Sequence, residues 1–157
     1  MSASDGIIKT VFKLPDRLKL GSDSSRIILY SIAFEEGIED YKNFIGLNSE
    51  YIEHYQKSTV ALEAHTTYLR SIRFDSLLIT TRIYNFDGKK AHIYQELFSS
   101  STLLAAQETL SISFDLRSRR TCPFDANIAR RYENLFAAQK KSTEPKFVGI
   151  SLDRLTE

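Results

Sequence analysis

The chain has 157 residues, of which 42% are apolar and 26% charged, and this length suits one domain with a full core but not two. The 21 basic and 20 acidic residues leave a net charge of +1, so no overall field favours nucleic acid or an anionic membrane surface. No apolar run approaches the roughly 20 residues needed to cross a bilayer. The one cysteine, Cys122, excludes an internal disulfide and multi-thiolate zinc sites, and it suits a reducing compartment. We therefore expect a single domain over residues 1–157, located in the cytoplasm, that binds neither nucleic acid nor membrane.

The first part of the chain predicts a strand followed by a long helix. Residues 7–14 alternate apolar and polar side chains and end at a proline, which removes a backbone donor. A loop rich in Gly and Ser follows, and Ser24 or Ser25 is the expected N-cap of a helix. Apolar residues then recur every three or four positions until Gly46, a typical C-cap glycine. We expect a helix over residues 25–45.

After a short helix that starts at Asn48, the period of the pattern changes to two. Four consecutive strands are predicted, over residues 59–72, 77–85, 91–98 and 103–116. Asp87 and Gly88 supply a hairpin turn between the second and third of them, because such turns need positive φ. Helical spacing returns over residues 125–141. A long antiparallel meander with one helix across its apolar face is an α+β, two-layer domain.

Glu63 and His65 lie two residues apart in the first of these four strands, so both point to the same face. A carboxylate and an imidazole so placed either share a polar cavity or belong to a solvated sheet face, and the spacing alone leaves both open. The three histidines lack metal-binding spacing, and Cys122 has no evident base beside it. We expect no metal and no cofactor.

Several segments of the chain resemble hotdog-fold acyl-CoA thioesterases. The segments are LEAHTTYLR (62–70), RFD (73–75), LITT (78–81), DGKKAHIYQE (87–96) and DLRSRRTCPF (115–124). They are most similar to relatives of 4-hydroxybenzoyl-CoA thioesterase, in the branch that hydrolyses betainyl-CoA in carnitine catabolism, and the likeness runs from about residue 13 to residue 130. The resemblance implies a hotdog sheet wrapped around the long helix, a homodimer or homotetramer with paired sheet edges, and an acyl-CoA substrate.

One family motif is altered in this chain. Between the first strand and the long helix the family carries a loop of the type Asp-Tyr-Asn-Gly-His-Met-Asn, whose Asp supports attack on the thioester. The matching residues 19–26 have no Asp, Asn-Gly or His in register. The catalytic carboxylate is therefore sought among Asp23, Glu63 and Glu36, with His65 to orient it and the N–H groups at the helix start to polarise the carbonyl.

Two hypotheses about function stay open at this point. The first is an acyl-CoA thioesterase for a short or polar acyl group. The second is a non-catalytic hotdog module that binds an acyl thioester or a protein partner. Most of the family segments are present, but the loop that carries the catalytic Asp in the family is not. A test for CoA release separates the two hypotheses.

Substrate binding is expected to use residues near two strand ends: Tyr68, Arg70, Arg73, Arg119 and Arg120. Guanidinium groups match the geometry of phosphate, and CoA carries phosphates. The alternative is that these arginines lie on a solvated face or form ion pairs with Asp75 and Asp115.

Overall fold

A computed structural model describes residues 5–15, 23–72, 76–139 and 145 of the chain. In chain order, the elements are β1 (Ile8–Lys13), α1 (Asp23–Ile45), α2 (Ser49–Tyr55), β2 (Lys57–Tyr68), β3 (Ser76–Phe86), β4 (Lys90–Ser99), β5 (Thr102–Asp115), β6 (Arg120–Thr121) and α3 (Ala126–Gln139). Helix α1 begins at Asp23, so Ser24 and Ser25 lie within the helix. The prediction that one of them is the N-cap is therefore wrong. The short strand β6 was not predicted.

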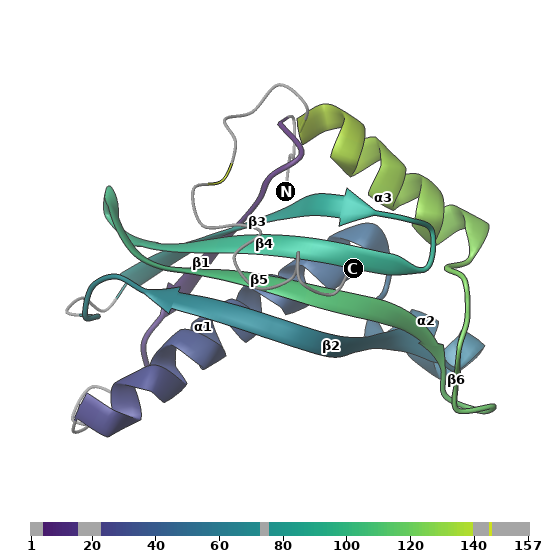
Figure 1. The fold of residues 1–157 in the computed structure, drawn as a ribbon, viewed down its shortest axis with the longest axis horizontal. Helices are drawn as coiled ribbons and strands as arrows, with labels where there is room; N and C mark the ends of the chain where they lie inside the picture. The colour runs from purple at the N-terminus through teal and green to yellow at the C-terminus, as the bar shows by residue number, and fades with distance from the viewer. Residues whose placement is uncertain (1–4, 16–22, 73–75, 140–144, 146–157) are drawn as a thin grey trace, which may run out of the picture.

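The strands form one antiparallel sheet in the order β1-β3-β4-β5-β2, and β6 pairs with the end of β5. The expected meander of four consecutive strands is wrong at its first member, because β2 pairs with β5 and β1 takes the place beside β3. Helix α1 runs across one face of this sheet, behind it in the view of Figure 1. It packs mainly against β1, β3 and β4. The predicted α+β class, with an antiparallel sheet and one long helix across it, is confirmed. No helix within the described residues is long and apolar enough to cross a membrane.

The middle of α1 lies very close to the sheet because it carries a glycine. A Cβ atom on Gly37 would stand 2.6 Å from Gln95 Nε2 and 2.7 Å from Ile79 Cγ2. Gln95, which is 1% exposed, donates from Nε2 to the backbone oxygen of Phe34 at 2.9 Å and to Thr81 Oγ1 at 3.1 Å. A polar side chain of the sheet therefore fixes where the helix rests.

Two clusters of buried apolar residues flank this contact. One packs the first half of α1 on the sheet and includes Tyr30, Phe34 and Leu97. The other joins the end of α1 to α3, through Tyr41 and Tyr132, whose rings lie 6.0 Å apart. Helix α3 thus covers the sheet at the end where α1 stops.

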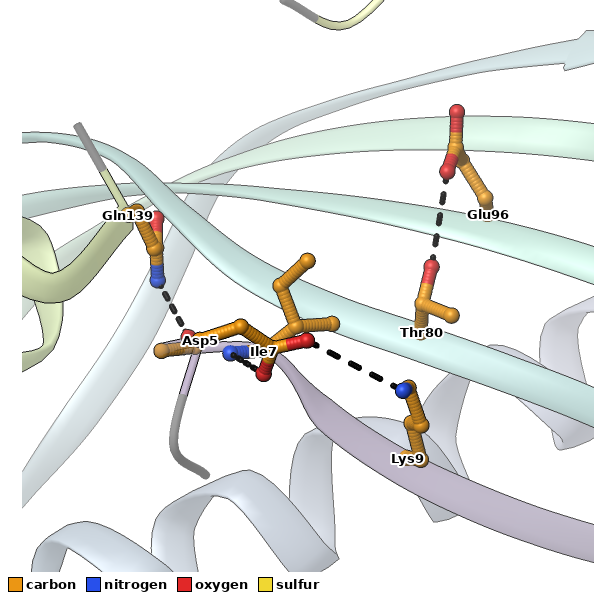
Figure 2. A network of polar contacts seen from close by, with 7 residues as sticks. Asp5, Ile7, Lys9, Thr80, Glu96 and Gln139 are labelled. Atoms are coloured by element: carbon orange, nitrogen blue, oxygen red, sulfur yellow. Dashed lines mark hydrogen bonds and ion pairs between the residues drawn. The ribbon is translucent and has the colours of Figure 1, made fainter. Parts of the chain in front are cut away.

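Polar contacts fasten the start of β1 to the end of α3 (Figure 2). Gln139 donates to the backbone oxygen of Gly6 at 2.5 Å. The Asp5 carboxylate accepts from the backbone N–H of Ile7 at 3.2 Å and lies 3.8 Å from Lys9 Nζ. The two ends of the described fold are thereby tied together.

Candidate active site

A groove opens where α1 leaves the sheet uncovered. Because α1 packs mainly on β1, β3 and β4, part of the same sheet face on β2 and β5 stays open. A cavity of about 320 Å³ lies there. Its lining residues are Glu35, Ile38, Tyr41 and Lys42 from α1, Thr59, Ala61 and Ala64 from β2, Gln107, Thr109 and Ser111 from β5, and Ile93 and Tyr132. We call this cavity the α1 groove.

Helical spacing brings three residues of α1 to the groove. Glu35, Ile38 and Lys42 recur at intervals of three and four residues, so they share one flank of the helix. Glu35 is exposed, whereas Lys42 is partly buried and its Nζ lies 2.8 Å from Glu39 Oε1. The groove therefore contains a solvent-accessible carboxylate, a lysine and the hydroxyl and amide groups of β2 and β5. Such a set can bind a polar group and accept a proton from water.

Glu36, the helix carboxylate expected from the sequence, is exposed but does not line the groove. One residue along a helix is a rotation of about 100°, which takes the neighbouring side chain off the flank. Glu35 was missed at the sequence level. The signal that finds it is its spacing to Ile38 and Lys42 on the uncovered flank of α1.

Glu63 and His65 share one face of β2, as the alternation predicts, but it is the face away from α1. The register decides this, because Thr66 pairs with Gln107, which lines the groove, and His65 pairs with Glu108, which points the other way. Thr66 Oγ1 donates to Gln107 Oε1 at 2.8 Å. The structure therefore places Glu63 and His65 on the face of β2 away from α1, and their proposed catalytic roles stay predictions.

His65 belongs instead to a buried polar cluster on the outer face of the sheet. Glu108 of β5 is completely buried, and its Oε2 lies 2.9 Å from His92 Nε2 on β4. His65 Nδ1 lies 3.9 Å from Glu108 Oε1. A buried carboxylate needs such partners, because an unpaired charge is costly away from water. Within the described part of the chain, no group of three or more His, Cys, Asp or Glu side chains is arranged to hold a metal ion.

The start of α1 is described only by its backbone. Asp23 is the first helical residue, and its side chain lies outside the described residues, as does the whole of Arg73. Their proposed roles stay predictions.

Tyr68 and Arg70 lie beside the first half of α1. Tyr68 is the last residue of β2, is 48% exposed, and its ring meets that of Tyr30 edge to face with centroids 5.1 Å apart. The Tyr30 hydroxyl donates to the backbone oxygen of Arg70 at 2.5 Å. These two predicted substrate-binding residues are thus held next to the helix.

Arg119 and Arg120 are exposed at the other end of the sheet. Arg120 pairs with Asp115 in the register of β5 and β6, and Asp115 also pairs with Lys57, the first residue of β2. Within one chain, therefore, the two groups of predicted phosphate-binding residues lie at opposite ends of β2.

Most of the chain matches a known protein family. A model of the thioesterase-like superfamily matches residues 26–132, which hold all but the first three residues of α1, the four long strands and the first half of α3. The chain belongs to the thioesterase-like superfamily. This membership confirms the prediction of a thioester hydrolase.

Individual relatives agree with this assignment. A betainyl-CoA thioesterase from Pseudomonas aeruginosa is 26% identical over 127 residues, which cover 79% of this chain and 80% of the relative. A Staphylococcus aureus protein solved in complex with CoA is similar with a TM-score of 0.81 and 21% identity, over 91% of this chain and 92% of the other. A DHNA-CoA thioesterase from the same species gives a TM-score of 0.75 and 14% identity, over 88% and 97%. The hotdog fold of the thioesterase-like superfamily is confirmed.

Proposed function

We propose that this protein hydrolyses the thioester bond of an acyl-CoA whose acyl group is short or polar, and that it does so as a homodimer. The observation that carries the proposal is the α1 groove, a cavity lined by both polar and apolar side chains, with a solvent-accessible carboxylate, in a chain of the thioesterase-like superfamily. The relatives that are named as betainyl-CoA and DHNA-CoA thioesterases, and the one solved with CoA, support acyl-CoA as the substrate.

The lining of the groove supports a small polar acyl group. At about 320 Å³ the groove lies at the lower end of the range of ligand sites, roughly 300 to 1,000 Å³. Hydroxyl and amide groups of Thr59, Thr109, Ser111 and Gln107 line it. These groups can form hydrogen bonds with a polar acyl group, which replace the hydrogen bonds that both lose to water. A long alkyl chain would displace the water but offer no hydrogen bonds in return.

Glu35 is the first choice for the general base, and the reaction then balances as follows. The Glu35 carboxylate takes a proton from water while the water oxygen bonds to the carbonyl carbon. The tetrahedral intermediate expels the CoA thiolate as the C–S bond breaks, and the proton on Glu35 passes to the thiolate. The products are the free acid and CoA, and the carboxylate is restored.

Asp23 is the rival carboxylate, because it lies at the start of α1, where backbone N–H groups can polarise a carbonyl. Asp23 and Glu35 are 12 residues apart, and a helix of that length extends about 18 Å. One carbonyl in one subunit therefore cannot contact both groups, and the choice between them is open to a direct test.

The homodimer is proposed from the edge of the sheet. Strand β2 is an edge strand of 12 residues, with Val60 42% and Leu62 55% exposed. A long apolar edge of this kind favours pairing with another strand. Antiparallel pairing of β2 with a second copy is two-fold symmetric, and it sets the start of one β2 beside the end of the other. Arg119 and Arg120 of one copy then approach Tyr68 and Arg70 of the other, so a CoA phosphate site would use both subunits.

The test is release of CoA from a panel of short polar, aromatic and long-chain acyl-CoA substrates. We expect the short polar members to be hydrolysed fastest. Glu35→Gln should lower kcat by roughly 100-fold or more, the usual effect of losing a general base. The matched control is Glu36→Gln, which removes the adjacent carboxylate outside the groove and should leave the rate within about two-fold of the parent.

Other outcomes would redirect the proposal. If Asp23→Asn abolishes activity while Glu35→Gln does not, the base lies at the start of α1. Loss of activity in Glu36→Gln alone restores the expectation from the sequence. If the parent binds CoA but releases none from any substrate, the protein is the non-catalytic binding module.

A further inference from the structure

A second cavity, of about 480 Å³, lies at the opposite end of α1 from the helix start. Its walls are α2, the start of β2 and the first turns of α3. The residues that matter for its chemistry are Tyr51 and Tyr55 of α2, Lys57 of β2, and Asp125 and Arg131 at α3. It has no lining residue in common with the α1 groove. We propose that this α2–α3 cavity is a binding site for a small aromatic carboxylate, separate from the thioester site.

The side chains that line the cavity carry one more positive than negative charge. Asp125 is the only carboxylate that lines it among the described residues, and both of its oxygens are engaged. Tyr51 Oη donates to Asp125 Oδ2 at 2.6 Å, and Lys57 Nζ donates to Asp125 Oδ1 at 2.5 Å. Lys57 and Asp125 neutralise each other, so the positive charge of Arg131 has no counterpart in the lining.

Arg131 is held in place but keeps donors available. Its Nη1 lies 3.5 Å from the backbone oxygen of Phe44, and the same atom would stand 2.7 Å from a Cβ on Gly46. Within the described part of the chain Arg131 forms no ion pair. A guanidinium group has five N–H donors in a planar fork that matches a carboxylate. Arg131 is exposed, so the N–H donors that it does not use are accessible to a carboxylate ligand.

The aromatic part of the ligand is inferred from the two tyrosines of α2 that line the cavity. The rings of Tyr51 and Tyr55 lie 4.8 Å apart at an angle of 39°, and Tyr55 is 52% exposed. The exposed ring of Tyr55 offers a flat apolar surface on which another ring can stack. The volume of the cavity falls within the range of roughly 300 to 1,000 Å³ that is typical of small-ligand sites.

The proposal is tested by calorimetric titration of the full-length protein with benzoate, in the presence of saturating CoA to occupy the thioester site. We expect one benzoate per chain. Arg131→Gln should weaken binding by about tenfold or more, as the loss of a charge-assisted hydrogen bond does. Arg130→Gln is the matched control, because Arg130 is an exposed arginine of the same helix that does not line the cavity, and it should bind like the parent. Benzamide, which has the ring without the charge, should also bind about tenfold more weakly.

Four binding results would overturn the proposal. They are no benzoate binding to the parent, equal loss in the two arginine variants, equal affinity for benzamide and benzoate, and release of benzoate by CoA. A changed molecular mass of Arg131→Gln by light scattering would likewise overturn it, because Arg131 would then belong to a subunit contact. None of these outcomes depends on whether the protein hydrolyses thioesters.

Discussion

Gly37 determines how close α1 comes to the sheet. The helix rests on Gln95 and Thr81, whose side chains bond to each other and to backbone oxygens of Phe34 and Gly37. Gln95 and Thr81 are both buried, so neither can turn toward solvent to make room. Because Gly37 has no side chain, α1 can lie at this distance from the sheet, and this distance sets the position of the helix flank that carries Glu35.

We predict that Gly37→Ala destabilises the protein, although alanine is the better helix former. The new methyl group would overlap Gln95 and Ile79, and the cost of overpacking exceeds the gain in helix propensity of about 1 kcal/mol. The expected net loss in the free energy of unfolding, measured with urea, is about 1–2 kcal/mol. Ser31→Ala, at an exposed position of the same helix, should change it by less than about 0.5 kcal/mol. An unchanged or higher stability of Gly37→Ala would mean that α1 lies farther from the sheet than described.

Asp125 joins three secondary-structure elements. It stands just before α3 and binds Tyr51 of α2 and Lys57 of β2. Partial burial alone would raise the pKa of Asp125, but the hydrogen bonds from Lys57 and Tyr51 outweigh it and lower the pKa below its usual value. The hydrogen bond to Asp125 likewise raises the pKa of Lys57. The ionised carboxylate therefore holds α2, β2 and α3 together.

This contact predicts a pH dependence of stability. The pKa of Asp125 is lower in the folded chain than in the unfolded one, so its contribution is present above the unfolded value of about 4 and is lost as the pH falls through the folded value. Asp125→Asn should lower the free energy of unfolding by about 1 kcal/mol at pH 7, because the group is partly solvated. The difference from the parent should shrink as the pH is lowered below about 4.

Urea titrations at pH 7 and at steps down to about pH 3 would measure this effect. Glu133→Gln removes a carboxylate from an exposed position of α3 and serves as the control. A deficit of Asp125→Asn that stays constant over this range would show that the carboxylate is not what holds the three elements.

The helices and long strands could be predicted from the sequence, but which of their side chains face α1 could be predicted only in part. Periodicity located α1 and the four long strands because each extends over many residues, whereas β6, with two residues, has no period to detect. Alternation placed Glu63 and His65 on one side of β2 but carries no information on which side faces α1. That depends on the pairing of β2 with β5, and Glu108, the partner of His65, lies 43 residues away in the sequence.

The two edges of the sheet differ in length and in the side chains that they expose. Strand β1 forms one edge, has six residues, and carries Lys9 and Lys13, which discourage pairing. Strand β2 forms the other edge, is twice as long, and exposes Val60 and Leu62. Only the β2 edge is long and apolar enough to favour a second copy, and residues that we predict to bind phosphate lie at its two ends.

We therefore predict that the protein is a dimer of about twice its 18.0 kDa chain mass, joined through β2. Leu62→Lys places a positive charge on that edge, and the lysines of the two subunits would repel each other across the two-fold axis. The variant should therefore weaken the dimer by about tenfold or more. Val11→Lys is the matched control, because Val11 is an even more exposed apolar residue, 67% against 55%, on the β1 edge. Light scattering over a dilution series would report the mass of each variant. If the phosphate site uses both subunits, Leu62→Lys should also raise KM for acyl-CoA in step with dissociation, whereas Val11→Lys should change neither quantity. A parent that is monomeric at micromolar concentration, or a Val11→Lys variant that dissociates as readily as Leu62→Lys, would show that the β2 edge does not form the dimer.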